Sequence, residues 1–146
     1  MDFMPDGRLA ISTWDAAGAV YLIENPDSND ESKMTVTKVA EGLAEPLGLK
    51  VVDGEIYVLQ KQELTKLIDH DGDDIIDEYK TLNNNWTTTG NFHEFAFGLV
   101  YKNGWFYGNL AIAILPGGAS ANPQAADRGK TSVSYTHLTL PTILRV

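Results

Sequence analysis

Short runs of apolar residues recur along this chain, and clusters of Gly, Pro, Asn and Asp separate them. Runs of this kind, bounded by turn-forming residues, are typical of β-strands. Three turn-forming pairs stand out, namely Asp6-Gly7, Asp53-Gly54 and Asn103-Gly104. Asp-Gly and Asn-Gly favour two-residue hairpins, because a type I′ turn needs positive φ at both central residues. The pattern therefore predicts an all-β fold built from hairpins.

The three pairs recur with a period near 50 residues. The intervals between Gly7, Gly54 and Gly104 are 54 − 7 = 47 and 104 − 54 = 50 residues. Each pair is followed by a strand-like run, namely Arg8–Thr13, Glu55–Leu59 and Trp105–Leu110. The second and third pairs are also preceded by such a run, namely Gly48–Val52 and Gly98–Lys102. Such a period, made of short strands and tight turns, is typical of a β-propeller blade. An ordinary β-sandwich would not explain it.

Further strand-like runs complete the first two units. These third and fourth strands are Ala19–Ile23 and Met34–Val39 in the first unit, and Glu63–Ile68 and Glu78–Leu82 in the second. An acidic loop separates the last two strands of both units. The third unit shows two strands and then a loop-like stretch, Leu115–Pro123. We therefore expect about two and a half four-stranded blades, at 1–41, 42–90 and 91–131. Since a ring takes about four to eight blades, we expect the chain to be a fragment of a longer propeller.

The end of the chain differs in character from the repeat. The run Ser132–Thr142 resembles the translation of an adapter used in sequencing libraries. We therefore expect native sequence to end near Thr131, and residues 132–146 to be a non-native tail without a functional role. The Thr and Leu content of this run would also suit a genuine third strand of the last unit, and that alternative stays open.

The acidic loop of the second unit has the composition of a metal site. Asp69, Asp71, Asp73 and Asp77 occupy positions 1, 3, 5 and 9 of this loop, counted from Asp69. Calcium takes several oxygen ligands from one flexible loop, with acidic residues at alternate positions. The first three aspartates are expected to point inward. The Ile75 carbonyl would supply the position-7 oxygen, and Asp77 would bind directly or through a water.

The loop departs from the EF-hand pattern at two places. Position 6, which is usually Gly, is Asp74, and the glycine stands at position 4 as Gly72. Asp tolerates left-handed backbone better than most residues, so the turn is still feasible. Position 12 is Lys80 and supplies no closing carboxylate. A solvated acidic hairpin loop without an ion is the competing interpretation. His70, at position 2, is expected to point away from an ion.

Charge and composition exclude several classes of partner. The chain holds 11 Lys and Arg against 20 Asp and Glu, so its formal net charge is −9, which argues against nucleic acid or an anionic membrane as partner. It has no cysteine for disulfides, thiol catalysis or zinc. No run approaches the roughly 18 apolar residues of a membrane span. Met1–Pro5 lacks the features of a signal peptide, so an exported parent would begin upstream.

Several runs of the second unit resemble one protein family. Gly42–Leu49, Asp53–Val58, Glu63–Leu67 and the following aspartate loop are similar to a blade of the bacterial glucose/sorbosone dehydrogenase-like propellers. That family is related to soluble quinoprotein sugar dehydrogenases. His93–Gly98 and Asp127–Lys130 also fit the family. The resemblance extends from Pro5 to Lys130, and Gly42–Gly98 is its specific part.

The resemblance implies a six-bladed ring, bound calcium, and export to the periplasm or the cell surface. It also implies oxidation of a sugar or alcohol by pyrroloquinoline quinone (PQQ), and a cytochrome c module in the parent protein. His93 would be the general base, since a neutral imidazole can accept a hydroxyl proton near pH 7. The spacing departs from the quinoprotein pattern, because there the histidine precedes the Gly-Pro-Asp-Gly-type turn by more residues. In addition, Leu99 stands where a proline is expected. The basic residues that hold the quinone lie on later blades, so we expect this fragment to be inactive.

A different class of function competes with the enzyme. The chain would then belong to a non-catalytic propeller that binds carbohydrate or protein, with purely structural calcium. The enzyme needs His93 to face a basic, quinone-sized pocket, whereas the binding module does not. Two further residues are candidates for this region. Glu94 is either a partner of His93 or exposed, and Trp86 either stacks on a sugar ring or packs over the rim of the ring of blades.

Overall fold

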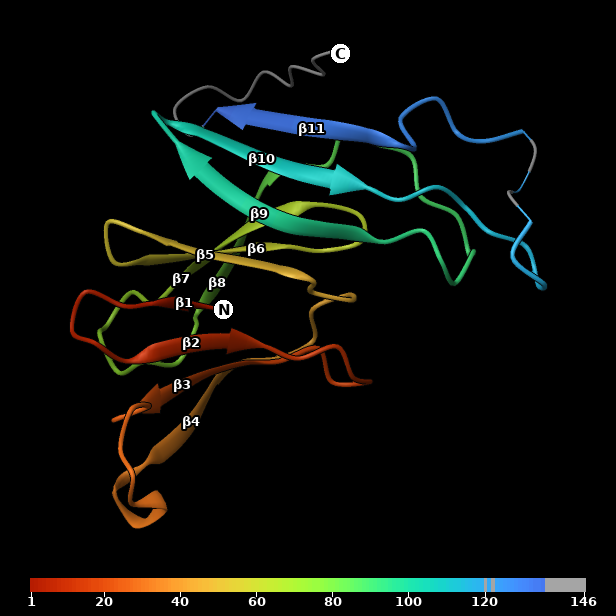
Figure 1. Cartoon of the computed structure of the whole chain (residues 1–146). Helices are drawn as coiled ribbons and strands as arrows, with labels where there is room; N and C mark the ends of the chain where they lie inside the picture. Colours follow the sequence, from red (N-terminus) through yellow and green to blue (C-terminus); the bar gives the residue numbers. More distant parts are fainter. Residues whose placement is uncertain (120, 122, 136–146) are drawn as a thin grey trace.

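The computed structural model describes residues 1–119, 121 and 123–135 (Figure 1). Within this range the chain forms strands and one short 3₁₀ helix, Glu31–Lys33. The strands are β1 Asp2–Phe3, β2 Leu9–Ser12, β3 Val20–Glu24, β4 Thr35–Ala40, β5 Gly48–Val52, β6 Glu55–Leu59, β7 Leu64–Ile68, β8 Glu78–Asn83, β9 Ala96–Lys102, β10 Trp105–Leu110 and β11 Lys130–Tyr135. The prediction of an all-β fold is confirmed.

The strands form three antiparallel sheets, each of which pairs only strands that are consecutive in the sequence. Sheet 1 has the order β1-β2-β3-β4, sheet 2 the order β5-β6-β7-β8, and sheet 3 the order β9-β10-β11. Figure 1 shows the sheets stacked one over another, with sheet 2 in the middle. Each expected unit therefore corresponds to one sheet. No closed sheet forms among the described residues, and the arrangement as blades of a ring stays a prediction.

Two of the three predicted hairpin turns have the expected geometry. Asp53 and Gly54 have φ of 52° and 84°, and Asn103 and Gly104 have φ of 52° and 84°. Positive φ at both central residues is what a type I′ turn requires. The runs Gly48–Val52 and Glu55–Leu59 therefore pair in register on either side of a two-residue loop.

The first hairpin turn differs from the prediction. Of the Asp6-Gly7 pair, only Gly7 has positive φ, at 91°. The backbone N–H of Gly7 donates to the Met4 carbonyl at 3.0 Å, and the N–H of Met4 donates to the Arg8 carbonyl at 2.8 Å. The loop thus contains three residues, a turn followed by a left-handed residue. Pro5 explains the change, because its ring holds φ near −65° at the first turn position.

Apolar side chains fill both spaces between the sheets. The first core, between sheets 1 and 2, contains Ala10, Val20, Leu22, Val39, Ala40, Leu43, Leu49, Ile56, Val58 and Leu67. The second core, between sheets 2 and 3, contains Tyr57, Leu59, Leu64, Trp86, Ala96, Phe106 and Leu110. Successive residues of β6 enter opposite cores, because side chains alternate across a strand. Sheet 2 is therefore covered on both faces.

The third unit has a third strand, which the sequence analysis gave as the alternative to a non-native tail. β11 pairs with β10 along its whole length, from Trp105↔Tyr135 to Leu110↔Lys130. The expected boundary at Thr131 thus falls inside a strand, and Ser132–Tyr135 of the expected tail belong to sheet 3. Residues 136–146 lie outside the described residues. A foreign run can also form a strand, so the expected non-native origin of 132–146 stays a prediction.

Candidate functional site

The aspartate loop joins β7 to β8 and rests on the neighbouring sheet. The backbone N–H of Asp77 donates to the Ile68 carbonyl at 2.9 Å, which closes the base of the loop. The N–H of Ile76 donates at 2.9 Å to the carbonyl of Val39, a residue of β4 in sheet 1. The Ile76 side chain packs against the first core. The loop is therefore held by both sheets, although its sequence lies in the second unit.

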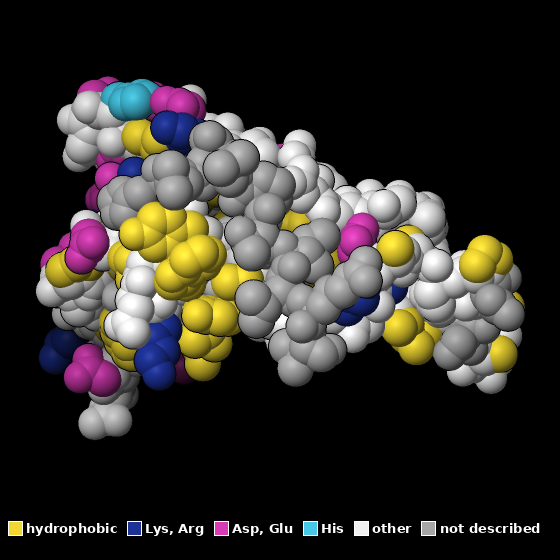
Figure 2. All heavy atoms as spheres, turned by 90° about the horizontal axis from the view of Figure 1, so that it is seen from above, with side chains coloured by type: hydrophobic (Ala, Val, Ile, Leu, Met, Phe, Trp, Pro, Cys, Tyr) yellow, Lys and Arg dark blue, Asp and Glu magenta, His cyan; other side chains and the backbone are white. Residues whose placement is uncertain are grey.

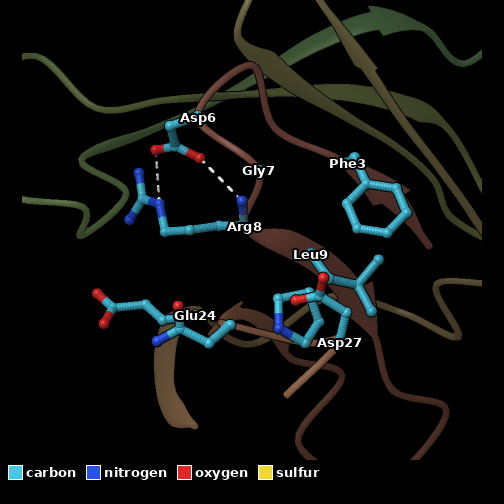
Figure 3. A pocket seen from close by; sticks show the side chains of 9 residues that line it. Phe3, Asp6, Gly7, Arg8, Leu9, Glu24 and Asp27 are labelled. Carbon is cyan, nitrogen blue, oxygen red and sulfur yellow. Dashed lines mark hydrogen bonds and ion pairs between the residues drawn. The ribbon is translucent and has the colours of Figure 1, made fainter. Parts of the chain in front are cut away.

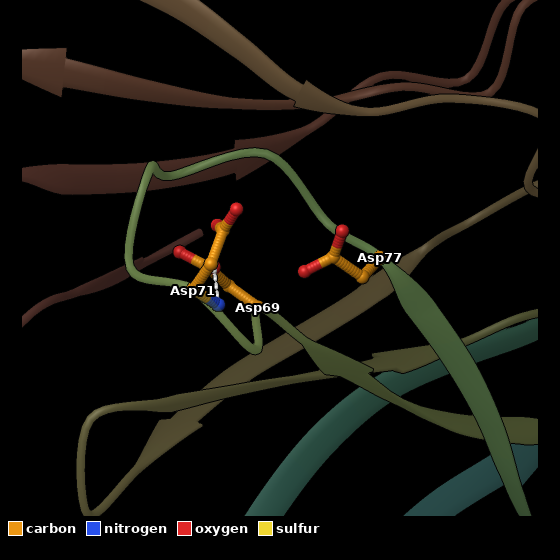
Figure 4. Close-up of side chains that lie close together, drawn as sticks. All are labelled: Asp69, Asp71 and Asp77. Carbon is orange, nitrogen blue, oxygen red and sulfur yellow. Dashed lines mark hydrogen bonds between the residues drawn. The ribbon is translucent and has the colours of Figure 1, made fainter.

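Three of the four expected carboxylates converge in this loop. One oxygen from each of Asp69, Asp71 and Asp77 lies within 4.8 Å of the others (Figure 4). Calcium–oxygen distances are about 2.3–2.6 Å, so two ligands on opposite sides of one ion are at most about 5 Å apart. The carboxylate spacing fits an ion of this kind, and the donor set of hard oxygens suits calcium.

The other two expected ligands are Asp73 and the Ile75 carbonyl. Asp73 lies outside the converging group, and its Oδ1 accepts the backbone N–H of Ile75 at 2.8 Å. The Ile75 side chain is exposed, and ligation by its carbonyl stays a prediction. The alternation of carboxylates along the loop thus places two of the first three, Asp69 and Asp71, beside Asp77.

Backbone N–H groups orient the first aspartate. Both oxygens of Asp69 accept hydrogen bonds, from the N–H groups of Asp71 at 3.2 Å, Gly72 at 2.7 Å and Asp74 at 2.8 Å. The bond from Gly72, with those from its neighbours, holds the pKa of Asp69 below its usual value. Gly72 and Asp74 have φ of 81° and 70°. The expected left-handed Asp at position 6 is therefore present, beside the displaced glycine.

Arg8 links this loop to the first hairpin turn. Its Nη1 lies 2.7 Å from Asp74 Oδ2, and its Nε lies 2.7 Å from Asp6 Oδ2. The ion pair with Asp74 raises the pKa of Arg8 above its usual value. A cavity of about 300 Å³ lies beside the ion pair, and residues of both sheets, among them Arg8, Leu67 and Asp69, line it. Sequence reasoning missed this contact, since its partners lie 66 positions apart in the sequence.

His70 lies outside the group of converging carboxylates, and its expected direction away from an ion stays a prediction. Its side chain is 60 % exposed, and its Nε2 lies 2.9 Å from Glu78 Oε2. Its backbone N–H donates to Asp77 Oδ2 at 2.8 Å. The residue therefore helps to position the Asp77 carboxylate through its main chain rather than through its ring.

His93 belongs to the connection between β8 and β9. Figure 1 shows this connection at the opposite end of sheet 2 from the aspartate loop. Its half-buried ring contacts Phe92 and Phe95, with centroids 5.0 and 6.0 Å away. Trp14, from the loop between β2 and β3, contacts both phenylalanines at 5.7 and 6.0 Å. Among the described residues, the His93 ring has no hydrogen bond or ion pair. The structure places it in an aromatic cluster rather than against a carboxylate.

Glu94 differs from both alternatives in the sequence analysis. Its side chain is buried, and its Oε2 accepts the N–H of Thr89 at 2.6 Å and lies 3.8 Å from Arg128 Nη2. Arg128 is also buried, and its Nη2 donates to the Thr87 carbonyl at 2.7 Å. This ion pair links the connection between β8 and β9 to the connection between β10 and β11. Nothing local in the sequence indicates it, because the two charges come from different loops.

Trp86 packs inside the second core. It is 8 % exposed, and its Nε1 donates to the Lys61 carbonyl at 2.8 Å. A tryptophan in this position closes the core and satisfies its one polar group. Its place supports the packing alternative of the sequence analysis over the sugar-stacking one.

Comparison of this chain with protein-family models, with curated proteins and with solved structures found no match. The described residues also contain no helix that is long and apolar enough to cross a membrane. Any function is therefore argued from the site itself and from the resemblance given above.

Proposed function

We propose that this chain binds calcium in the loop 69–77, as a segment of an exported β-propeller. The observation that supports this proposal is the convergence of the Asp69, Asp71 and Asp77 carboxylates within 4.8 Å. Three negative charges at this distance repel one another, and a divalent cation between them removes that repulsion. All three ligands are hard oxygens, which suit calcium and not the softer transition metals.

The contacts of the loop indicate a structural role for the ion. The Arg8–Asp74 ion pair and the Ile76–Val39 hydrogen bond both connect the loop to sheet 1. An ion that orders the loop would therefore also hold sheets 1 and 2 together. Ligand binding to the folded state alone stabilises a protein by about 2.7 kcal/mol when the ligand is at 100 times its Kd. Calcium is thus expected to raise the thermal stability of the chain.

Isothermal titration calorimetry with Ca²⁺ tests this proposal, with Mg²⁺ as a competing ion. The chain should bind one Ca²⁺, and Asp71→Asn should weaken binding about tenfold or more, since affinity follows the number of ligand charges. Within the described part of the chain, Asp71 accepts a single backbone hydrogen bond, from Asp73 at 3.3 Å, so the loop keeps its other contacts. Asp27→Asn, in the corresponding loop of sheet 1, is the matched control. Absence of heat, or equal binding by both variants, would refute the proposal.

A second candidate function is oxidation of a sugar or an alcohol, with His93 as general base. The cluster of Trp14, Phe92 and Phe95 beside His93 favours it, because aromatic faces suit a sugar ring. The residues in contact with the His93 ring do not fit PQQ, since this quinone carries carboxylates and the described contacts of the ring are two phenylalanines. We therefore derive no step through the quinone.

An activity assay separates the two candidates. Calcium binding without catalysis predicts no sugar or alcohol dehydrogenase activity when PQQ and an electron acceptor are added to this chain. Turnover that is lost in His93→Asn would favour the enzyme. Export to the periplasm or cell surface, and a cytochrome c module as partner, stay predictions from the resemblance.

A further inference from the structure

The cavity beside the Arg8–Asp74 ion pair lies between two sheets. Its walls come from the first hairpin turn and two strands of sheet 1, from strands of sheet 2, and from the aspartate loop. Its volume is about 300 Å³, which reaches the lower end of the range of small-molecule sites, about 300–1,000 Å³. The cavity is therefore enclosed by described elements on both sides and is no part of the outer face of either sheet.

One part of the cavity is a continuation of the first core. Its apolar lining residues are Met4, Leu22, Val39, Ile56, Leu67 and Ile76. Met4 and Ile76 pack against the first core, and the other four belong to it. Two further lining residues, Gly54 and Gly72, bring no side chain that fills the space. An aliphatic cavity of about 150 Å³ already holds a benzene-sized molecule, so this one has room for an apolar group of about six carbons.

Charged groups line the rest of the cavity. Glu55, Asp69 and Asp74 contribute three carboxylates, and among the described lining residues Arg8 is the one cation. Arg8 is paired twice, because its Nη1 lies 2.7 Å from Asp74 Oδ2 and its Nε lies 2.7 Å from Asp6 Oδ2. Figure 3 shows the second of these contacts. Carboxylates of the chain itself therefore balance the charge of Arg8.

The remaining charge around the cavity is negative. Lys66 Nζ lies 3.2 Å from Glu55 Oε1 and adds one cation beside the lining, as Asp6 adds one carboxylate. Four carboxylates then stand against two cations among these described groups. Figure 2 shows further acidic side chains at this end of the molecule, at the left of the view. Such a field attracts cations and repels anions.

We propose that this cavity binds a small organic cation, a primary alkylammonium. Its chain fills the apolar part, and its ammonium group faces the carboxylates of Glu55, Asp69 and Asp74. An ammonium group has three N–H donors, so it reaches more than one carboxylate at once. A neutral molecule of the same shape offers no charge to these carboxylates, and an anion is repelled by them. The site shares only Asp69 with the converging carboxylates of the calcium loop.

Three probes with the same six-carbon chain test the proposal, namely hexylammonium, 1-hexanol and hexanoate, each titrated into the ¹³C-labelled chain and followed by NMR. The buffer contains EDTA, so the result does not depend on calcium binding. Hexylammonium should bind with a Kd of about 1 mM or below and shift the methyl resonances of Leu22, Ile56 and Leu67. Leu64 and Leu110, in the second core, should not shift. 1-Hexanol should bind about threefold more weakly or worse, and hexanoate should leave the spectrum unchanged.

Each contrary result is informative. Equal binding of hexylammonium and 1-hexanol would show an apolar cavity without a cation site and would overturn the proposal. Preference for hexanoate would show that Arg8 dominates the cavity, with the same consequence. An absence of methyl shifts with all three probes would also overturn it.

Two pairs of variants place the site in this cavity. Met4→Phe enlarges a lining side chain and should weaken hexylammonium binding severalfold, whereas Met34→Phe, in the residue before β4 and outside the lining, should not. Glu55→Gln removes a lining carboxylate and should weaken binding about threefold. Glu78→Gln removes the same charge from an exposed residue outside the lining and should have little effect. Equal effects within both pairs would place the probe elsewhere and overturn the proposal.

Asp71→Asn separates this proposal from the calcium site. Asp71 belongs to the converging carboxylates but does not line the cavity. The variant should therefore bind hexylammonium normally, whatever its affinity for Ca²⁺. Loss of hexylammonium binding in this variant would mean that the probe occupies the metal loop and would overturn the proposal. Far-UV circular dichroism verifies that every variant is folded.

Discussion

Truncation of Phe106 is the most direct test of the packing between sheets 2 and 3. Its side chain is 1 % exposed, and its ring contacts Tyr57 and Tyr101 with centroids 4.7 and 4.9 Å apart. Phe→Ala substitutions in a core cost about 3–5 kcal/mol, because they remove apolar burial and leave a cavity. Each aromatic pair adds about 0.5–1.5 kcal/mol beyond its buried area. We therefore expect Phe106→Ala to fall in the upper half of the 3–5 kcal/mol range.

Urea denaturation followed by fluorescence measures this loss in the free energy of unfolding. Domains of this size have a total stability of about 5–15 kcal/mol, so the variant should be close to unfolding. Phe97→Ala is the matched control, because Phe97 belongs to the same sheet and is 43 % exposed. Its cost should be within about 0.5 kcal/mol. A loss below about 1 kcal/mol for Phe106→Ala would refute a core between these sheets.

Three further predictions follow from close contacts and charges. A Cβ at Gly48 would lie 2.9 Å from Leu59 Cβ in the paired strand and 3.0 Å from Leu99 Cβ across the second core, whereas Gly90 has open space. Gly48→Ala should therefore cost about 1–3 kcal/mol in thermal denaturation, and Gly90→Ala far less. Glu94→Gln leaves buried Arg128 without its ion pair and should cost about 3 kcal/mol or more by urea denaturation. Because the pKa of Asp69 is lowered on folding, its hydrogen bonds stabilise the loop above its unfolded pKa and are lost as pH falls through its folded pKa. The NMR carboxyl shift of Asp69 should therefore titrate below pH 3.8, and a midpoint above that value would contradict the loop geometry.

The sequence predicted the hairpins well where the turn alone determines them. The strands on either side of Asp53-Gly54 have the predicted bounds, because Gly54 follows a residue that tolerates positive φ. At Asp6-Gly7 the preceding Pro5 changed the turn, and a two-residue strand, β1, was too short to recognise. The strand β11 was only the alternative interpretation, since most of its residues were assigned to a tail. Local rules thus fail where a neighbouring residue or a distant strand decides the conformation.

Part of the candidate site was also accessible from the sequence. Alternating aspartates predicted the convergence of Asp69 and Asp71, but the same alternation was wrong for Asp73, whose carboxylate accepts the Ile75 N–H instead. The contacts that anchor the loop to sheet 1 were not predicted. Arg8 and Asp74 meet only when two sheets stack, and no local pattern encodes that contact.

An NMR titration with Ca²⁺ tests the central claim at the level of single residues. Amide resonances of Asp69–Asp77 should shift in saturable fashion, and smaller shifts should reach Val39, whose carbonyl accepts the Ile76 N–H. The loop Glu24–Ser32 of sheet 1 should remain unchanged. An absence of shifts, or shifts concentrated in that other acidic loop, would contradict a calcium site in the middle sheet.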